Sequence, residues 1–203
     1  GLDLFIDILN HGHWHAPWVE DQMNEWKVAI PTYRLIRSAS YYWPELTESE
    51  KEKILKIIEQ TANEFLSKNP ETGWQGDTKA EENAWNASFL VAASQFYSAH
   101  DNSSEWEEKA KCFAYHTLTR STDQSYCGFK TQTLNDNFTL QNHGRNPNPV
   151  YATSAIHLLA ESASIYHGLG KDIPDEFKHN VLEVANNLNN FISPSYHYFV
   201  DQQ

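Results

Sequence analysis

The stretch KAEENAWNASFLVAASQFYSA, residues 79–99, decides the class of fold that this sequence encodes. Its apolar residues recur three and four positions apart, which is typical of a helix. From Asn83 to Phe96, alanine, serine and large apolar side chains leave few charges on any face. This composition predicts a helix that is buried on all sides. Residues 149–169 have the same character, most clearly from Tyr151 to Ile165.

Other helical segments are apolar on one face only. The segment 47–68 begins with a capping box formed by Thr47 and Glu50. It carries one apolar stripe, made of Ile54, Leu55, Ile58, Ala62, Phe65 and Leu66. The segments 103–119 and 174–192 have the same one-sided pattern, and 2–10 and 19–43 complete the set of predicted helices. No convincing alternation of apolar and polar residues predicts a strand, so the sequence predicts an all-α fold.

The two kinds of helix alternate along the chain. Candidate inner helices start near 19, 79 and 149, and their outer partners follow near 47, 103 and 174, so that one helical hairpin recurs about every 55–70 residues. A hairpin of this kind cannot bury its inner helix alone and must stack against others. We therefore predict stacked helical hairpins that form part of an α/α toroid over 1–203, as one domain. A short echo, NHGH at 10–13 and NHGR at 142–145, precedes two of the inner segments.

Composition excludes several functional classes. The 203 residues hold no apolar run near the roughly 18 residues of a membrane-spanning helix. The 7 Trp, 10 Tyr and 10 Phe favour a packed core over disorder. A net charge of −12 has the wrong sign for binding nucleic acid or an anionic membrane. Cys112 and Cys127 match neither a metal motif nor a disulfide framework.

The chain is expected to be part of a larger whole. It begins at Gly1, and its only methionine is Met23, which predicts a piece of a longer protein. Three hairpins are too few to close a ring, and unpaired terminal repeats normally need polar caps. We therefore predict self-association or a dependence on missing neighbouring domains.

Three loops that lead into the predicted inner helices carry unusual residues for connectors. These are Asn10–Trp18, Gly73–Trp85 and Ser125–Tyr151, which are rich in Trp, His, Asn, Asp and Glu. In stacked hairpins the inner helices all point the same way, so these loops gather at one end, where a rigid scaffold often carries its site. We expect a single cleft with tryptophans at its rim, lined by His11 or His13, Asn83, Asn142 and His143.

Two motifs in these loops resemble a known family. EENAW at 81–85, and NDNFTLQNHG at 135–144 followed by Tyr151, are similar to the α/α-toroid region of heparinase II/III-like proteins, which resemble polysaccharide lyases. The resemblance implies β-elimination of a uronic-acid polysaccharide. One residue neutralises the C5 carboxylate, a Tyr or His removes the C5 proton, and a Tyr protonates the leaving oxygen. This chain has fewer hairpins than the family's toroid and lacks the β-sandwich that normally follows.

Carried onto this chain, the resemblance assigns proton transfer to His143 and Tyr151. Asn142 joins them as a catalytic candidate in the neutralising role. The predicted substrate-binding residues are His11, His13, Trp14, Trp74, Asn83 and Arg145. The alternating histidines of HGHWH, residues 11–15, could share one face, but no Cys or carboxylate at a standard spacing completes a metal site. We predict a carbohydrate partner, with no metal and no cofactor.

Two other functions remain open. In a glycoside hydrolase on the same architecture, paired carboxylates would act on a neutral sugar, which suits the −12 charge. The candidate acids are Asp77, Glu81, Glu82 and Asp136. The third function is a non-catalytic helical-repeat module that binds a protein or glycan. Several candidates also have a structural interpretation, since Glu81 and Glu82 complement a helix dipole and Asn142 suits a turn.

Overall fold

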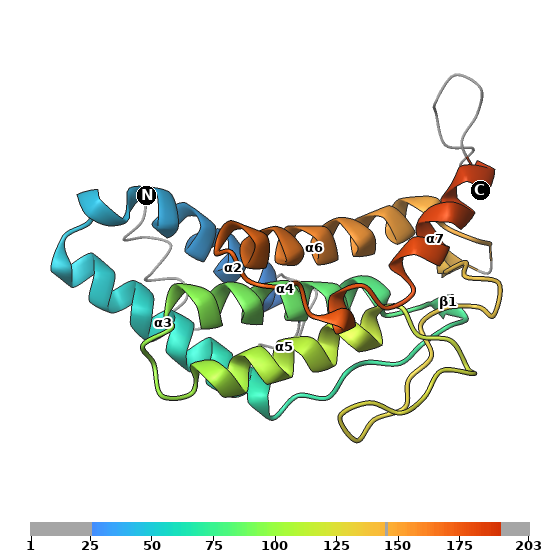
Figure 1. Cartoon of the computed structure of the whole chain (residues 1–203), viewed down its shortest axis with the longest axis horizontal. Coiled ribbons are helices and arrows are strands. Elements are labelled where there is room, and N and C mark those ends of the chain that lie inside the picture. The colour runs from blue at the N-terminus through green and yellow to red at the C-terminus, as the bar shows by residue number, and fades with distance from the viewer. Residues whose placement is uncertain (1–25, 145, 192–203) are drawn as a thin grey trace. The chain divides into compact units, whose positions relative to one another are not determined.

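The computed structural model describes residues 26–144 and 146–191, and this part of the chain is all-α, as the sequence predicts (Figure 1). The helices are α2 (Trp26–Tyr42), α3 (Glu48–Leu66), α4 (Ala80–Phe96), α5 (Ser103–Thr117), α6 (Pro149–Gly168) and α7 (Val181–Leu188). Short 3-10 helices are η1 (Trp43–Glu45), η2 (Asp175–Phe177) and η3 (Asn189–Phe191), and two short strands are β1 (Gly76–Asp77) and β2 (Asn142–Gly144). Within the described residues, no helix has the length and apolar character needed to cross a membrane.

Most helix boundaries agree with the sequence, and one segment differs. The predicted segments 47–68, 79–99, 103–119 and 149–169 correspond to α3, α4, α5 and α6, whereas 2–10 lies outside the described residues. The segment predicted over 174–192 is helical only in part, because it is divided into η2, a turn, α7 and η3.

The break falls at Asn180, which adopts a left-handed backbone with φ 55°. Its side-chain Nδ2 donates to the carbonyl oxygen of Leu118 and to Oδ2 of Asp123, each at 2.7 Å. A left-handed residue cannot continue a right-handed helix. The side-chain hydrogen bonds of Asn180 hold this left-handed conformation, so η2 ends before Asn180 and α7 begins directly after it.

Residue contacts divide the chain into two compact units, where the sequence predicts one domain. The first unit comprises residues 1–68 and 89–109, and its described part includes α2, α3, the second half of α4 and the first half of α5. The capping box of α3 is present: Thr47 N donates to Glu50 Oε2 at 2.8 Å, and Glu50 N donates to Thr47 Oγ1 at 3.3 Å. The buried residues of α3 form one stripe, as predicted, made of Ile54, Ile57, Ile58, Thr61, Ala62 and Phe65.

The second unit comprises residues 69–88 and 110–203. Within it, Ser88 on α4 donates to the carbonyl oxygen of Leu158 on α6 at 3.0 Å, and Ser162 donates to Ser88 Oγ at 3.0 Å. Small hydroxyl side chains at these positions let the two helices approach closely while every hydroxyl remains hydrogen-bonded. The stacking of hairpins into a toroid stays a prediction.

The expectation that α6 is buried all round is corrected. The buried residues of α4 run without a break from Asn86 to Ser94, but α6 buries one face. That face consists of Pro149, Ala152, Ala155, Leu158, Leu159, Ser162 and Tyr166. On the other side His157, Ala160 and Ser164 are exposed. Small and weakly polar residues tolerate either environment, so a lack of charges did not require burial.

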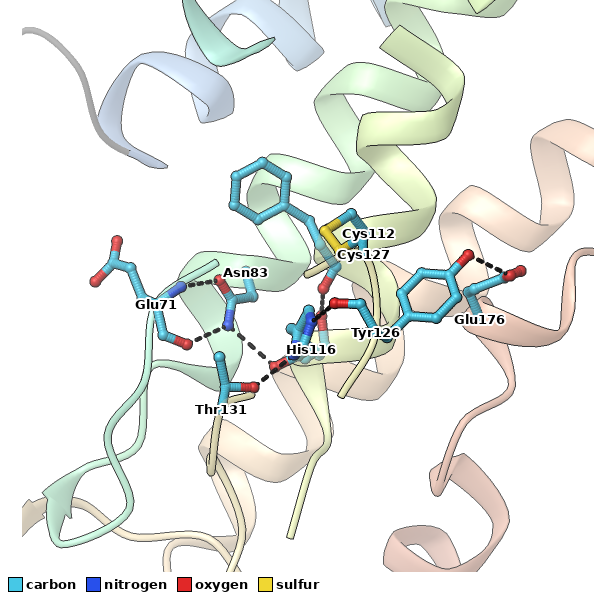
Figure 2. The surroundings of a disulfide bond; sticks show 10 residues. Glu71, Asn83, Cys112, His116, Tyr126, Cys127, Thr131 and Glu176 are labelled. Carbon is cyan, nitrogen blue, oxygen red and sulfur yellow. Dashed lines mark hydrogen bonds between the residues drawn. A yellow bond between two sulfur atoms is a disulfide. The ribbon is translucent and has the colours of Figure 1, made fainter. Parts of the chain in front are cut away.

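A disulfide bond joins Cys112 of α5 to Cys127 in the long loop that follows, with Cα atoms 5.9 Å apart (Figure 2). This corrects the interpretation of the two cysteines as matching no disulfide. Cys127 and Gly128 have φ angles of 41° and 86°, and Tyr126 and Phe129 on either side exchange two backbone hydrogen bonds. Two successive residues with positive φ form a tight turn of the type found in β-hairpins. The turn places Cys127 against α5.

Replacing both cysteines by alanine is expected to lower the free energy of unfolding by about 3 kcal/mol, because the bond closes a loop of 15 residues. Urea denaturation of the chain and of the Cys112→Ala/Cys127→Ala variant measures the difference. Wild-type protein treated with a thiol reductant serves as the matched control and should lose a similar amount. Two titratable thiols in the untreated native chain would contradict the bond.

Candidate functional site

The second and third of the loops singled out in the sequence meet in the second unit. Strands β1 and β2 pair antiparallel, with Gly76 opposite Gly144 and Asp77 opposite Asn142. The backbone N–H of Thr78 donates to the carbonyl oxygen of Gln141 at 3.2 Å. The pairing brings the residues before α4 next to those before α6. The first loop, with His11, His13 and Trp14, lies outside the described residues, as does Arg145.

His143 and Tyr151, the two predicted proton-transfer residues, form a direct contact. His143 Nε2 lies 2.6 Å from the Tyr151 hydroxyl oxygen. His143 is exposed on β2, with a left-handed φ of 56°, and Tyr151 is partly exposed in the first turn of α6. A non-glycine residue with positive φ is uncommon and persists where its surroundings hold it.

Asn148 connects the backbone of Tyr151 to that of Asn142, the residue before His143. Its Oδ1 accepts the backbone N–H groups of Val150 and Tyr151 at 3.2 and 3.4 Å, and so caps the start of α6. Its Nδ2 donates to the carbonyl oxygen of Asn142 at 3.3 Å. Asparagine is a favoured residue at a helix N-cap, so the local sequence fixes where α6 and Tyr151 begin relative to β2.

Three carboxylates and one ammonium group lie around this pair. Lys79 Nζ contacts Asp77 Oδ2 at 2.6 Å and Glu82 Oε1 at 3.3 Å. Burial alone would lower the pKa of Lys79, but the hydrogen bond to Asp77 and the charge of Glu82 raise it above its ordinary value. Lys79 therefore remains charged and is shared between two acids.

The pKa values in the cluster determine which groups hold protons. Burial, and then the neighbouring charge of Glu82, raise the pKa of Glu81, although a hydrogen bond from Trp85 and the charge of His143 act in the other direction. Burial, followed by the charges of Glu81, Glu82 and Asp77, raises the pKa of Tyr151. Tyr151 is thus a protonated phenol at neutral pH, and its hydroxyl is hydrogen-bonded to His143 Nε2. An imidazole beside a phenol can take up and release protons.

Other predicted site residues have different surroundings. Trp74 is 41% exposed in the loop before β1, and Asn142 is half-buried on β2. Asp136, one of the alternative acids, instead accepts a hydrogen bond from Ser121 at 2.8 Å. The structure therefore brings Asp77, Glu81 and Glu82 near the His143–Tyr151 pair and gives Asp136 a partner elsewhere in the long loop.

Asn83 is not a cleft residue, which corrects the prediction. It is fully buried, and its Oδ1 accepts the backbone N–H of Glu71 at 2.9 Å. Its Nδ2 donates to the carbonyl oxygens of Glu71 and His116 at 2.9 and 3.0 Å (Figure 2). An amide that satisfies buried backbone groups in this way is not available to a substrate.

One group in the described part of the chain has the composition of a metal site: Cys112, His116 and Cys127, whose ligand atoms lie within 4.8 Å of one another. The disulfide uses both sulfur atoms. His116 Nδ1 lies 2.6 Å from Thr131 Oγ1, and Nε2 lies 3.1 Å from the carbonyl oxygen of Tyr126. Burial lowers the pKa of His116, so the ring is neutral and donates from Nε2 to that carbonyl. The group acts here as a structural anchor for the long loop.

Lys79 and Asn86 are the residues of this region that sequence reasoning missed. Glu82 Oε2 and Asn86 Oδ1 are buried one helical turn apart on α4, and neither has a hydrogen-bond partner within the described part of the chain. The spacing of four residues between Glu82 and Asn86 is visible in the sequence. Whether their oxygen atoms meet a hydrogen-bond donor depends on the tertiary structure.

Comparison with models of protein families, with curated proteins and with solved structures gives no match to this chain. Conclusions about function therefore follow from the geometry of the second unit.

Replacing Asn83 by alanine is expected to cost stability rather than ligand affinity. Three backbone groups would lose a partner in the interior, so we expect the free energy of unfolding to fall by about 2–4 kcal/mol. Urea denaturation measures this loss. The control is Asn142→Ala, a half-exposed amide for which we expect a change within about 0.5 kcal/mol. Equal effects in the two variants would contradict a structural role specific to Asn83.

Glu81→Gln is expected to change stability in a pH-dependent way. A carboxyl whose pKa is raised by folding favours the folded state when protonated and disfavours it when ionised. The stability of the variant relative to wild type should therefore rise as the pH increases from about 4 through the raised pKa of Glu81. Thermal unfolding at several pH values measures the difference. A constant difference across this range would show that the pKa of Glu81 is not raised.

Proposed function

We propose that this chain is a carbohydrate-active domain that cleaves a uronic-acid polysaccharide by β-elimination, with His143 and Tyr151 as its acid–base pair. The observation that carries the proposal is the 2.6 Å contact between His143 Nε2 and the Tyr151 hydroxyl. Both residues belong to the motif that resembles heparinase II/III-like proteins. An exposed imidazole next to a partly exposed phenol suits a reaction in which one proton is removed and another is delivered.

The reaction balances on these two side chains. When the substrate binds, the Tyr151 hydroxyl turns from His143 to the leaving oxygen, which frees His143 Nε2 to take the proton from C5. The C5–H electron pair forms a C4–C5 double bond, and the C4–O bond breaks. The leaving oxygen takes the hydroxyl proton of Tyr151. His143 then returns its proton to the Tyr151 oxygen along the hydrogen bond between them, so both groups are restored without consuming water. Because the two side chains are in contact, the proton is removed and delivered from the same side of the sugar.

Other residues contribute to binding in this proposal. Asn142 lies next to His143 on β2 and can donate its side-chain amide to an oxygen on which negative charge develops. Trp74 offers an exposed ring of the kind that packs against sugars. The toroid arrangement of the hairpins is part of the same proposal and would supply the cleft for a polymer.

A glycoside hydrolase is the second candidate, and the raised pKa of Glu81 favours it. A carboxyl group whose pKa is raised holds its proton to higher pH and can act as the general acid, and Asp77 would be the second carboxyl group of the pair. Release of reducing sugar without unsaturation, lost in Glu81→Gln, would select this function over β-elimination.

For β-elimination, His143→Ala and Tyr151→Phe should each lower the formation of unsaturated product by about 100-fold or more, because each removes one of the two proton carriers. Ultraviolet absorbance of the new double bond measures the reaction. His157→Ala, whose ring is 69% exposed on α6, and Tyr41→Phe, which is 72% exposed, are matched controls expected to retain activity. Unchanged helical circular dichroism in all four variants shows that they fold. Full activity of both site variants would reject the assignment.

A further inference from the structure

We propose that the chain, once its disulfide is reduced, binds a zinc ion at Cys112, His116 and Cys127, and that the disulfide is the oxidised form of this site. The ligand atoms of the three residues lie within 4.8 Å of one another, and the two sulfur atoms are joined (Figure 2). The site is independent of the proposed function, because it contains neither His143 nor Tyr151.

Two of the three ligands come from one face of α5. Cys112 and His116 are four residues apart on this helix, so their side chains are neighbours, and both are buried. The same spacing places the two zinc-binding histidines of the HExxH motif on one side of a helix. The third ligand, Cys127, comes from the tight turn in the long loop and is exposed. The helix therefore supplies a fixed half of the site, and the turn closes it.

The distances suit a tetrahedral ion. With Zn–S bonds of about 2.3 Å and a Zn–N bond of about 2.0 Å, tetrahedral ligand atoms lie about 3.5–3.8 Å apart. The imidazole nitrogen of His116 already lies no more than 4.8 Å from either sulfur atom. Reduction lets the sulfur atoms separate, and the exposed side chain of Cys127 can adjust. A shift of about 1 Å is enough to surround the ion.

The imidazole ring of His116 is held in the way that metal-binding histidines are. Nδ1 lies 2.6 Å from the hydroxyl oxygen of Thr131, and Nε2 lies 3.1 Å from the carbonyl oxygen of Tyr126. Both partners can accept a hydrogen bond. Whichever ring nitrogen binds zinc, the other therefore donates its N–H to a partner that it already contacts, which fixes the orientation of the ring.

A dithiol reductant would convert the disulfide into the zinc site. A thiolate of the reductant attacks the exposed sulfur atom of Cys127, the S–S bond breaks, and Cys112 leaves as a thiolate. The second thiol of the reductant then releases Cys127 and completes a disulfide within the reductant, so the protein gains two electrons and two protons. Zinc displaces the two thiol protons and binds two thiolates and one neutral imidazole, with water in the fourth position.

Both forms of the site hold the same turn. The disulfide and the zinc ion each connect Cys112 on α5 to Cys127 in the long loop. Tyr126, next to Cys127, donates its hydroxyl to Glu176 in η2 at 2.7 Å. The metal would therefore keep the loop on α5 under reducing conditions, in which the disulfide is lost.

The test measures metal binding by the whole chain in its two redox states. The chain is reduced with a phosphine, freed of reductant under nitrogen and titrated with Co²⁺, whose absorption bands report thiolate ligands and tetrahedral geometry. We expect one Co²⁺ per reduced chain, displaced by one Zn²⁺, and binding at least about 100-fold weaker in the oxidised chain. Zinc should also slow alkylation of the two thiols by iodoacetamide at least about tenfold.

Two results would overturn the inference at this stage. One is a reduced chain that shows no cobalt–thiolate band. The other is a reduced chain that loses its helical circular dichroism and does not regain it when zinc is added.

Variants identify the ligands. In the reduced chain, His116→Gln should lower zinc affinity at least about tenfold, and Cys127→Ser at least about 100-fold. The control is His157→Gln, at a position 69% exposed on α6, which should leave the affinity unchanged. Circular dichroism shows whether the variants fold; if His116→Gln does not, Cys127→Ser, at an exposed position, decides. Unchanged zinc affinity in a folded variant of either ligand overturns the inference.

Discussion

The buried amide of Asn83 is the contact on which the second unit depends most. It binds the backbone of Glu71 through both its oxygen and its nitrogen, and it binds the carbonyl oxygen of His116 at the end of α5 (Figure 2). Backbone groups in the interior must be paired, and this amide supplies partners for both backbone groups of Glu71 and for the carbonyl oxygen of His116. One side chain from the first turn of α4 therefore binds two other segments, the loop at Glu71 and the end of α5.

His116 extends this network into the long loop. Its ring contacts the Thr131 hydroxyl, and Thr131 in turn lies 2.8 Å from the hydroxyl of Thr119. The disulfide fixes the turn at Cys127 to α5, and Tyr126 in that turn donates its hydroxyl to Glu176 in η2 at 2.7 Å. Because the loop is anchored at several points, its later part can present β2 to β1. The surface pair of His143 and Tyr151 thus rests on buried contacts that contain neither residue.

The site itself combines two opposing requirements. Burial near α4 raises the pKa values of Glu81 and Tyr151, which keeps protons on groups that would give them up more easily in water. Exposure of His143 on β2 keeps an acceptor accessible to a ligand. Lys79 lowers the cost of placing Asp77 and Glu82 together, because its ammonium group contacts both carboxylates.

The amino-acid sequence by itself determined the helical class, the capping box of α3 and the boundaries of α3 to α6. It also placed His143 and Tyr151 in one loop cluster. These features depend on residues a few positions apart, through apolar periodicity, N-caps and turn preferences. The tertiary structure alone decided that Asn83 points inward, that Cys112 meets Cys127, and that Asn180 interrupts the last helix. Each of these outcomes is fixed by a partner at least 12 positions away, as the separation of Glu71 from Asn83 illustrates. Local patterns specify which segment is a helix, whereas the partners of a buried polar group are set only once distant segments have packed.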